Sequence, residues 1–258
     1  MRVLIVGDQH FRHELSYGAS ISDGRRSEWR AVLETIHKAG ESCEAIVLLG
    51  DNLNSRHNHS SVIRSFVQFL NGFKDKEIHV IAGNHERYGK ETAIDFLKGV
   101  DKKNWLIYTE PTLARVSGDI EAMFIPYITP NLIGVKTKEE AHDAVMASFP
   151  TSKIPLVFLH HGIKSSVWGA GSVDTDLFNE VVFSQELLEE RADCIFGGHI
   201  HIPQSLSDKT YVAGSIFTTE VGEYSKSVWV YNTDTKTAEE IELPVRGIYK
   251  HIWNGASS

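Results

Sequence analysis

Short runs of apolar and β-branched residues recur along the chain, and polar residues follow each run directly. The length and composition of these runs are typical of buried strands. In an α/β sheet, ligand-binding groups gather at the carboxyl ends of strands, so the pattern predicts an edge lined with polar side chains. The runs are Val3–Val6, Ala45–Leu49, Ile78–Ile81, Leu156–Leu159 and Cys194–Phe196.

Apolar residues at helical spacing separate the first strands. One such series runs from Trp29 to Ile36. A second helix has an apolar arc of roughly 160°, wide enough for the sheet and for a smaller contact with another subunit. A third, short helix is predicted over Glu91–Gly99. The arc of the second helix consists of Val62, Ile63, Phe66, Val67, Phe69, Leu70 and Phe73.

The middle of the chain changes character, with short strand-like runs between turn residues. These runs predict an antiparallel second sheet. Helices are expected at 136–149 and 185–191, each leading into one of the later buried strands, and further strands at 211–213, 228–231 and 239–243. The runs in the middle are Trp105–Tyr108, Leu113–Val116 and Ile120–Ile125.

Composition narrows the class of protein. With 258 residues and 41% hydrophobic content, the chain can fill one large core, and we expect a single domain over residues 1–258. Cys43 and Cys194 lie beside or inside predicted strands, which favours core thiols over a disulfide. No charged leader precedes the first strand and no apolar stretch could span a bilayer, so we expect a cytoplasmic protein without membrane contact.

The formal net charge of −8 argues against a free-standing nucleic-acid binder. Bound divalent cations would offset part of this charge locally. Charge alone therefore leaves the partner open.

Four polar clusters follow the predicted strands in order. GHxH aims two imidazoles to the same side of a strand, which is costly to bury without a cation. A lone GD or DxH is usually an ordinary turn. The functional interpretation therefore depends on all the clusters together with His160. The clusters are Asp8-Gln9-His10, Gly50-Asp51-Asn52, Gly83-Asn84-His85-Glu86 and Gly198-His199-Ile200-His201.

The donors suit two divalent metal ions. A pair of ions about 3.5–4 Å apart needs a bridging anion, for which Asp51 is the natural candidate. Imidazole, carboxylate and amide donors without thiolate fit manganese, iron or zinc better than calcium or magnesium. The sequence therefore predicts two divalent ions, manganese first, with iron or zinc as alternatives.

The ordered clusters resemble the signature of the calcineurin-like metallophosphoesterases. The resemblance covers nearly the whole chain and implies an α/β (α+β) four-layer sandwich of two mixed β-sheets flanked by helices. It also implies that His85 meets the scissile phosphate without binding metal, and an imidazole can protonate a leaving alkoxide near neutral pH. The implied ligands are Asp8, His10, Asp51 and His201 for one metal, and Asp51, Asn84, His160 and His199 for the other. The neighbouring His161 is the alternative to His160.

Two further stretches resemble the SbcD-type DNA repair exonuclease subunits. These are Ala192–Gln204, which contains the last metal motif, and Val212–Ile216 with the following Val221-Gly222-Glu223. Two features depart from that group. Asn54 stands where a further His is usual, with His57 or His59 as possible substitutes, and the capping domain of the group is absent or truncated. The resemblance implies DNA as substrate, a homodimer and an SbcC-like coiled-coil ATPase partner.

Some residues carry weaker signals. Basic residues near the first metal motif are candidates for phosphate contacts. Tyr127 and Trp168 could stack on a base, although core packing is the more common role of such residues. His37, His79, His142 and His251 lack a motif and are expected to be surface or packed residues. The basic candidates are Arg12, His13, Arg25 and Arg26.

These observations predict a dinuclear-metal phosphodiesterase, first a manganese-dependent DNA exonuclease or endonuclease subunit of DNA repair or recombination. The alternative is a metallophosphoesterase acting on a small phosphodiester or phosphomonoester, such as a cyclic nucleotide. A third reading, a binding subunit that has lost catalysis, conflicts with the intact ligand set and His85.

Overall fold

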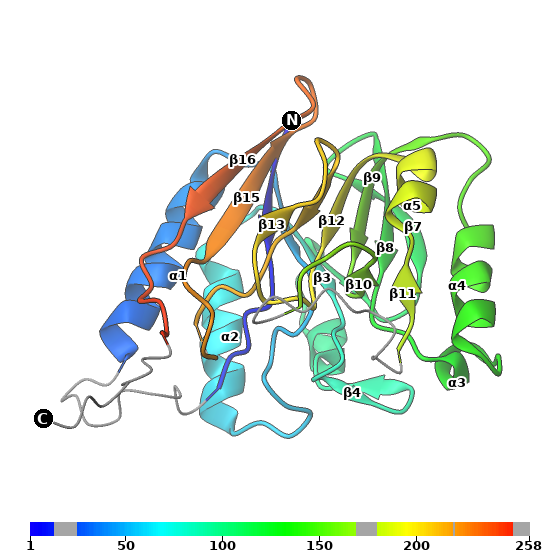
Figure 1. Cartoon of the computed structure of the whole chain (residues 1–258). Helices are drawn as coiled ribbons and strands as arrows, with labels where there is room; N and C mark the ends of the chain where they lie inside the picture. Colours follow the sequence, from blue (N-terminus) through cyan, green and yellow to red (C-terminus); the bar gives the residue numbers. More distant parts are fainter. Residues whose placement is uncertain (13–24, 169–179, 219, 250–258) are drawn as a thin grey trace, which may run out of the picture.

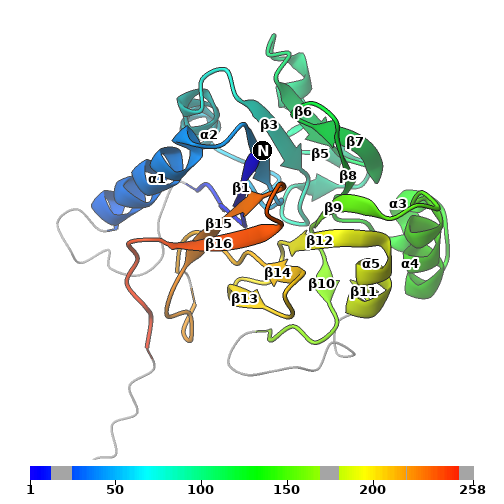
Figure 2. The same cartoon turned by 90° about the horizontal axis from the view of Figure 1, so that it is seen from above.

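The computed structural model describes residues 1–12, 25–168, 180–218 and 220–249. Two six-stranded sheets face each other, and helices cover the outer face of each (Figure 1). The view from above shows α1 and α2 on one side of the sandwich and α3, α4 and α5 on the other (Figure 2). This four-layer arrangement confirms the predicted fold class.

The first sheet has the strand order β16-β15-β1-β2-β3-β6, and its strands β1, β2, β3 and β6 run parallel. β15 joins β1 antiparallel, and β16 forms the edge. The strands are β1 (Arg2–Val6), β2 (Ala45–Leu48), β3 (Glu77–Ile81), β6 (Trp105–Tyr108), β15 (Ser227–Asn232) and β16 (Thr237–Glu242).

The second sheet has the order β13-β14-β12-β9-β8-β7. β8, β9, β12 and β14 are parallel, whereas the edge strands β7 and β13 are antiparallel to their neighbours. The strands are β7 (Thr112–Val116), β8 (Ile120–Ile125), β9 (Ile154–Leu159), β12 (Ala192–Gly197), β13 (Gln204–Ser205) and β14 (Thr210–Val212).

Helices and smaller elements complete the described chain. Two-stranded pairs form from β4 (Arg87–Tyr88) with β5 (Glu91–Thr92), and from β10 (Gly162–Ile163) with β11 (Val182–Phe183). The helices are α1 (Arg26–Glu41), α2 (Ser60–Gly72), η1 (Asp95–Gly99), α3 (Pro130–Ile133), α4 (Lys138–Ala147) and α5 (Gln185–Arg191). Within the described part of the chain, no helix has the length and apolarity needed to cross a membrane.

Strand alternation divides the apolar residues between three core layers. In β1, Leu4 and Val6 face the layer under α1 and α2, while Val3 and Ile5 face the layer between the sheets. The third layer lies between the second sheet and helices α4 and α5. Because both faces of β1 are apolar, the hydrophobic pattern alone does not exclude a slip of one residue, which would exchange the two faces. The pairing with β2 and β15 fixes the register of β1.

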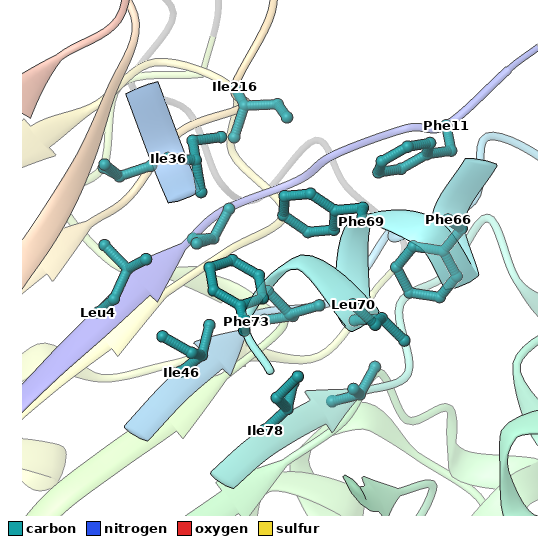
Figure 3. Packing of buried hydrophobic residues seen from close by; sticks show 14 of the residues in the cluster. Leu4, Phe11, Ile36, Ile46, Phe66, Phe69, Leu70, Phe73, Ile78 and Ile216 are labelled. Atoms are coloured by element: carbon teal, nitrogen blue, oxygen red, sulfur yellow. The ribbon is translucent and has the colours of Figure 1, made fainter. Parts of the chain in front are cut away.

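The apolar arc of α2 is mostly used by the core of its own chain. Phe66, Phe69 and Leu70 are buried, and Figure 3 shows them beside Ile46 and Ile78 of the first sheet. Only Ile63 and Val67 keep part of their surface exposed. The sheet therefore takes most of the arc, as expected.

Two expected elements differ from the structure. Trp105–Tyr108 is not part of an antiparallel second sheet, because it pairs parallel to β3 in the first sheet as β6. The second sheet itself is mixed. The helix expected at Glu91–Gly99 is replaced by strand β5 and the 3₁₀ helix η1. Cys43 and Cys194 are free and buried, as expected.

Candidate metal centre

The loops that follow the parallel strands meet at one end of the sandwich. β1 is followed by Asp8 and His10, and β2 by Asp51. The structure thus brings all the predicted site residues together from both sheets. The remaining members are Asn84 and His85 after β3, His160 after β9, and His199 and His201 after β12.

Three of these residues have a left-handed backbone. The φ angle is 46° at His10, 45° at Asp51 and 76° at His199. Such a conformation costs a non-glycine residue about 1–3 kcal/mol and is found mainly where the surrounding structure holds it in place for a function. Three residues of the cluster therefore have a strained backbone conformation.

Two glycines of the motifs allow the loops to approach each other. A Cβ atom at Gly50 would collide with the ring of His160, and one at Gly83 would collide with the carboxylate of Asp51. Gly50 also has a φ of 103°, which favours glycine. The glycines of GDN and GNHE are thus needed for the close approach of the ligands.

One set of donors gathers around Asp8. Potential ligand atoms of Asp8, His10 and His201 lie within 4.8 Å of one another. The Nε2 atoms of His10 and His201 are 3.0 Å apart, and His10 Nε2 is 3.7 Å from Asp51 Oδ2. Asp51 thus extends this set toward the second one.

A second set gathers around Asn84. Its Oδ1 atom lies 3.0 Å from His160 Nε2 and 3.0 Å from His199 Nδ1. His160 Nε2 is also 3.4 Å from Asp51 Oδ1. Asp51 therefore lies between the two sets, with one oxygen toward each.

The carboxylates are in an unusual electrostatic environment. Burial, followed by the charge of Asp51, raises the pKa of Asp8 well above its ordinary value. Burial also opposes ionisation of Asp51, but His160, His10 and His85 together outweigh this effect and lower the pKa of Asp51. Burial lowers the pKa of His10 well below its ordinary value, so this imidazole is neutral and suited to bind metal.

The residues present fit a pair of divalent metal ions. Among the described residues, Asp8 Oδ2 and His10 Nδ1 are buried atoms without a hydrogen-bond partner. A buried carboxylate oxygen without a partner is costly, and a cation compensates that cost directly. Neutral imidazoles, carboxylates and an amide oxygen form a donor set that binds transition metals.

His85 differs from the other candidates by its exposure. Its side chain is 42% exposed, and its Nε2 atom is 3.8 Å from Asp51 Oδ2. His85 Nδ1 lies 3.0 Å from the carbonyl oxygen of Asn54. Since a carbonyl can only accept, Nδ1 carries the hydrogen and Nε2 is free to exchange a proton with a ligand. His10, Asp51 and His85 also form a group of ligand atoms within 4.8 Å, so distance alone admits His85 as a ligand.

The two adjacent histidines after β9 have opposite surroundings. His160 faces the cluster, whereas His161 accepts from the backbone N–H of Ile128 and lies beside the carbonyl oxygens of Val181 and Pro126. Burial lowers the pKa of His161 well below its ordinary value. His161 is thus held by backbone groups, and His160 is the member of the pair that faces the donors.

Three carboxylates support the cluster, and the sequence assigned no role to them. Glu86 accepts from the backbone N–H groups of Gly83 and Leu53, and so joins the two loops. Burial, followed by the charge of Asp51, raises the pKa of Glu86 to about 8. Glu180 Oε1 is 2.9 Å from His199 Nε2, and Glu223 Oε1 is 3.2 Å from His201 Nδ1.

Contacts of this kind fix the orientation and tautomer of a histidine that binds metal. Glu86 and Glu223 could have been found in the sequence, because they belong to the GNHE and GE stretches. Glu180 lies outside any motif, and only the fold brings it to His199.

Among the basic residues near the first motif, Arg25 differs from the expectation of phosphate contacts. Arg25 is buried, pairs with Glu28 and donates to Thr218, so it is a structural residue. This correction arises because Glu28 and Thr218 already accept hydrogen bonds from its guanidinium. Arg26 is exposed at the start of α1, Arg12 is partly buried, and His13 lies outside the described residues.

In the polar loop after β2, the two histidines that could substitute for one at position 54 have different surroundings. His59 is the N-cap of α2 and accepts from the backbone N–H of Ser61. His57 is exposed, with its ring 6.5 Å from that of Tyr88. Asn54 contributes its backbone carbonyl, which holds His85.

The remaining aromatic and histidine candidates have packing roles in most cases. Tyr127 stacks on His161, and Trp168 meets His199 edge-on at 5.3 Å. His37 contacts Phe69 and Phe73, and His79 is buried between Glu77 and Tyr108. His142 lies beside Asp143, and His251 is outside the described residues.

A pocket of about 240 Å³ opens beside the GHxH motif that follows β12. His199, His201, Trp168 and Glu223 are among its lining residues. It is large enough for a small ligand group next to the donors.

Comparison with known proteins identifies the family. The model of the calcineurin-like phosphoesterase family matches residues 1–203, so the chain belongs to this family. The family typically holds a dinuclear metal centre, and membership indicates a metal-dependent phosphoester hydrolase. The search of curated proteins gave no match.

Solved structures show the same fold. The chain is similar to a dimetal phosphatase from Danio rerio, with a TM-score of 0.57, 9% identity and coverage of 95% of this chain and 97% of that one. A protein of Thermus thermophilus gives a TM-score of 0.54 and 12% identity, covering 94% and 98%. An archaeal phosphodiesterase gives 0.46 and 12%, covering 94% and 100%. At these identities the likeness to the Danio rerio and Thermus thermophilus proteins concerns the fold alone.

Proposed function

We propose that this protein is a dinuclear-metal phosphodiesterase that cleaves DNA with manganese. The exposure of His85 carries the proposal, because a residue that meets a continuous backbone must be reachable from outside the molecule. Beside it, the loop from Ser55 to Ser61 is polar and largely exposed. An open, polar approach of this kind suits a polymer better than a closed pocket does.

The ligand sets follow the two groups of donors. Asp8, His10, Asp51 and His201 would hold one ion, and Asp51, Asn84, His160 and His199 the other. When bound, divalent ions activate a water for attack on phosphorus and neutralise charge on the phosphate oxygens.

His85 supplies the proton for the leaving group in this proposal. Its Nδ1–H donates to the Asn54 carbonyl, which fixes the ring and leaves Nε2 as the atom that transfers the proton. Transfer from Nε2 to the departing sugar oxygen returns the ring to its neutral form. Asn54 thereby acts through its backbone to orient His85.

A small phosphodiester or phosphomonoester, such as a cyclic nucleotide, is the second candidate substrate. The pocket beside His199 and His201 favours it, because a volume of about 240 Å³ can take a compact ligand. Trp168 would form an aromatic wall of that site.

We further propose a cytoplasmic homodimer joined to a coiled-coil ATPase. The stretches Ala192–Gln204 and Val221–Glu223, which resemble the SbcD-type subunits, support this proposal. On an acidic chain, weak binding of DNA by the isolated protein would make such a partner useful.

A substrate panel tests the proposed function. The protein is incubated with manganese at low ionic strength and with single-stranded DNA, double-stranded DNA, a cyclic nucleotide or bis(p-nitrophenyl) phosphate. We expect slow degradation of DNA that a chelator abolishes. Intact DNA together with efficient hydrolysis of a small substrate would replace the nuclease by the second candidate.

A further inference from the structure

An exposed aromatic and basic surface lies outside the metal centre. Tyr88 is 62% exposed, whereas a tyrosine side chain is more often largely buried. The guanidinium carbon of Arg56 is 5.6 Å from the centre of the Tyr88 ring, and the His57 ring is 6.5 Å away. We call Arg56, His57 and Tyr88 the Tyr88 platform.

Short backbone connections hold the platform next to His85. The loop that carries Arg56 begins with Asn54, whose carbonyl binds His85. On the other side, Arg87 donates its backbone N–H to the carbonyl of Asn84 at 3.3 Å and starts the β4–β5 hairpin that presents Tyr88. Both parts of the platform are therefore fixed to the segments that carry the proposed acid.

The hairpin is also anchored from beneath. The Arg87 guanidinium donates to the backbone carbonyls of Tyr127 and Thr109. The backbone N–H of Ala93 donates to the carbonyl of Glu86 at 2.8 Å. A fixed hairpin can present an aromatic ring to a ligand without a large loss of conformational freedom on binding.

The charge of this region differs from that of the whole chain. The net charge of the protein is −8, but residues 54–61 include Arg56 and no acidic residue. Lys90 and Glu91 in the hairpin offset each other. The platform is thus a locally basic surface on an acidic protein, which suits an anionic ligand.

We propose that the Tyr88 platform binds single-stranded nucleic acid on the leaving side of the scissile bond. A base would stack on Tyr88, and a phosphate would lie at Arg56. This inference rests on the proposed function and names its substrate class more closely. An aromatic ring beside a cation is the arrangement that binds unpaired nucleotides without sequence preference. In a duplex both faces of an inner base are covered by its neighbours, so stacking on Tyr88 requires an unpaired nucleotide.

The location beside His85 gives the platform its direction. His85 protonates the oxygen that leaves, so the part of the substrate nearest to it belongs to the leaving group. A nucleotide held at Tyr88 would therefore lie on the leaving side of the scissile bond. Substrates whose leaving group lacks a nucleobase should not bind more tightly because of the platform.

A binding experiment compares two labelled strands of equal length, oligothymidylate and an abasic strand. Fluorescence anisotropy is measured at low salt with manganese, in the His85→Ala protein so that the strands are not cut. Tyr88→Ala should weaken binding of oligothymidylate by about 5- to 150-fold, the range that corresponds to the loss of one stacked base. Its binding of the abasic strand should not change.

Three further variants separate stacking from charge. Tyr88→Phe keeps the ring and should bind both strands normally. Arg56→Ala should weaken both strands and reduce the salt dependence by about one phosphate contact. Arg64→Ala, which removes an exposed arginine on α2, is the matched control and should change neither.

The proposal fails if Tyr88→Ala affects both strands equally or neither strand. Either result would leave Tyr88 as a surface residue or as a contact for another protein. Hydrolysis of bis(p-nitrophenyl) phosphate by the protein with an intact His85 tests the proposed function separately. Absence of that hydrolysis would refute the phosphodiesterase while the binding data still decide the platform.

Discussion

At the scale of single residues, Asp51 is the group on which the candidate centre depends. Its two oxygens lie toward different donor sets, one 3.4 Å from His160 and the other 3.7 Å from His10. It is also held in place, since Oδ1 accepts from the backbone N–H of His85 at 2.9 Å. A carboxylate in this position can bridge two cations.

Asp51→Asn should therefore lose at least one metal ion per chain and most activity. An amide bridges poorly and carries no negative charge. Elemental analysis of the purified variant after equilibration with manganese measures the occupancy. Two ions per chain in the variant would remove Asp51 from the bridging position.

His85→Ala distinguishes an acid from a ligand. If His85 acts on the phosphate, the variant keeps both ions while turnover drops by roughly 10²–10⁴-fold. His10→Ala is the contrasting variant, because loss of a ligand lowers metal occupancy itself. Loss of metal from His85→Ala would make His85 a ligand, and normal turnover would leave the leaving group without its proposed acid.

The residues of the cluster could be predicted because each follows a strand and belongs to a motif. Their supports were harder to predict, since a contact such as Glu180 with His199 joins residues that no sequence pattern links. Arg25 shows the opposite difficulty. It is close to the first motif in sequence, but Glu28 and Thr218 already occupy its donors.

At the scale of elements, the start of α1 is tied to the C-terminal segment through Glu28. Its carboxylate accepts from the side chain of Arg25 and from the backbone and side chain of Arg246. Burial opposes its ionisation, but the hydrogen bond from Arg25 and those from Arg246 outweigh burial and lower the pKa of Glu28.

This network predicts a stability that depends on pH. A carboxyl group whose pKa is lowered in the folded state stabilises the fold fully at a pH above its unfolded-state pKa, which is about 4.3 for glutamate. This stabilisation is lost as the pH falls through the pKa of the folded state. Glu28→Gln should lower the melting temperature at neutral pH by about 2–5 °C. In thermal scans with chelator, the difference from the parent protein should shrink in acid.

Glu34→Gln removes an exposed carboxylate from the same helix and is the matched control. It should change neither the melting temperature nor its pH dependence. A Glu28→Gln difference that persists unchanged in acid would show that the ionised form of Glu28 contributes nothing special.

How well an element could be predicted depended on its sequence context. α5 was expected at its observed bounds, because its spacing and the following strand leave little freedom. In contrast, the run Trp105–Tyr108 has the composition of any strand, and only its parallel pairing with β3 assigns it to the first sheet. In the Glu91–Gly99 segment, Glu91 and Thr92 pair with β4, and the five residues Asp95–Gly99 of η1 are too few for a stable α-helix.

At the scale of the whole molecule, the apolar surface that α2 leaves exposed limits the dimer that the protein can form through this helix. The core takes most of the arc of α2, leaving only Ile63 and Val67 partly exposed. A dimer that uses α2 must therefore be built largely from its polar side chains. Such an interface would be weak and concentration-dependent.

We expect light scattering to show a dimer at high micromolar concentration that dissociates on dilution. The mass should fall toward 28.9 kDa as the protein is diluted. A single mass of one chain at all concentrations would mean that the surface of α2 serves only its own fold.

The proposed ligands come from both sheets, which has a consequence for how the protein is assembled. Asp8, Asp51 and Asn84 extend from the first sheet, while His160, His199 and His201 extend from the second. Neither sheet alone holds a complete set. If these residues bind the two ions as proposed, a chain whose sheets have not docked should stay empty, and metal loading would then report that the sandwich has closed.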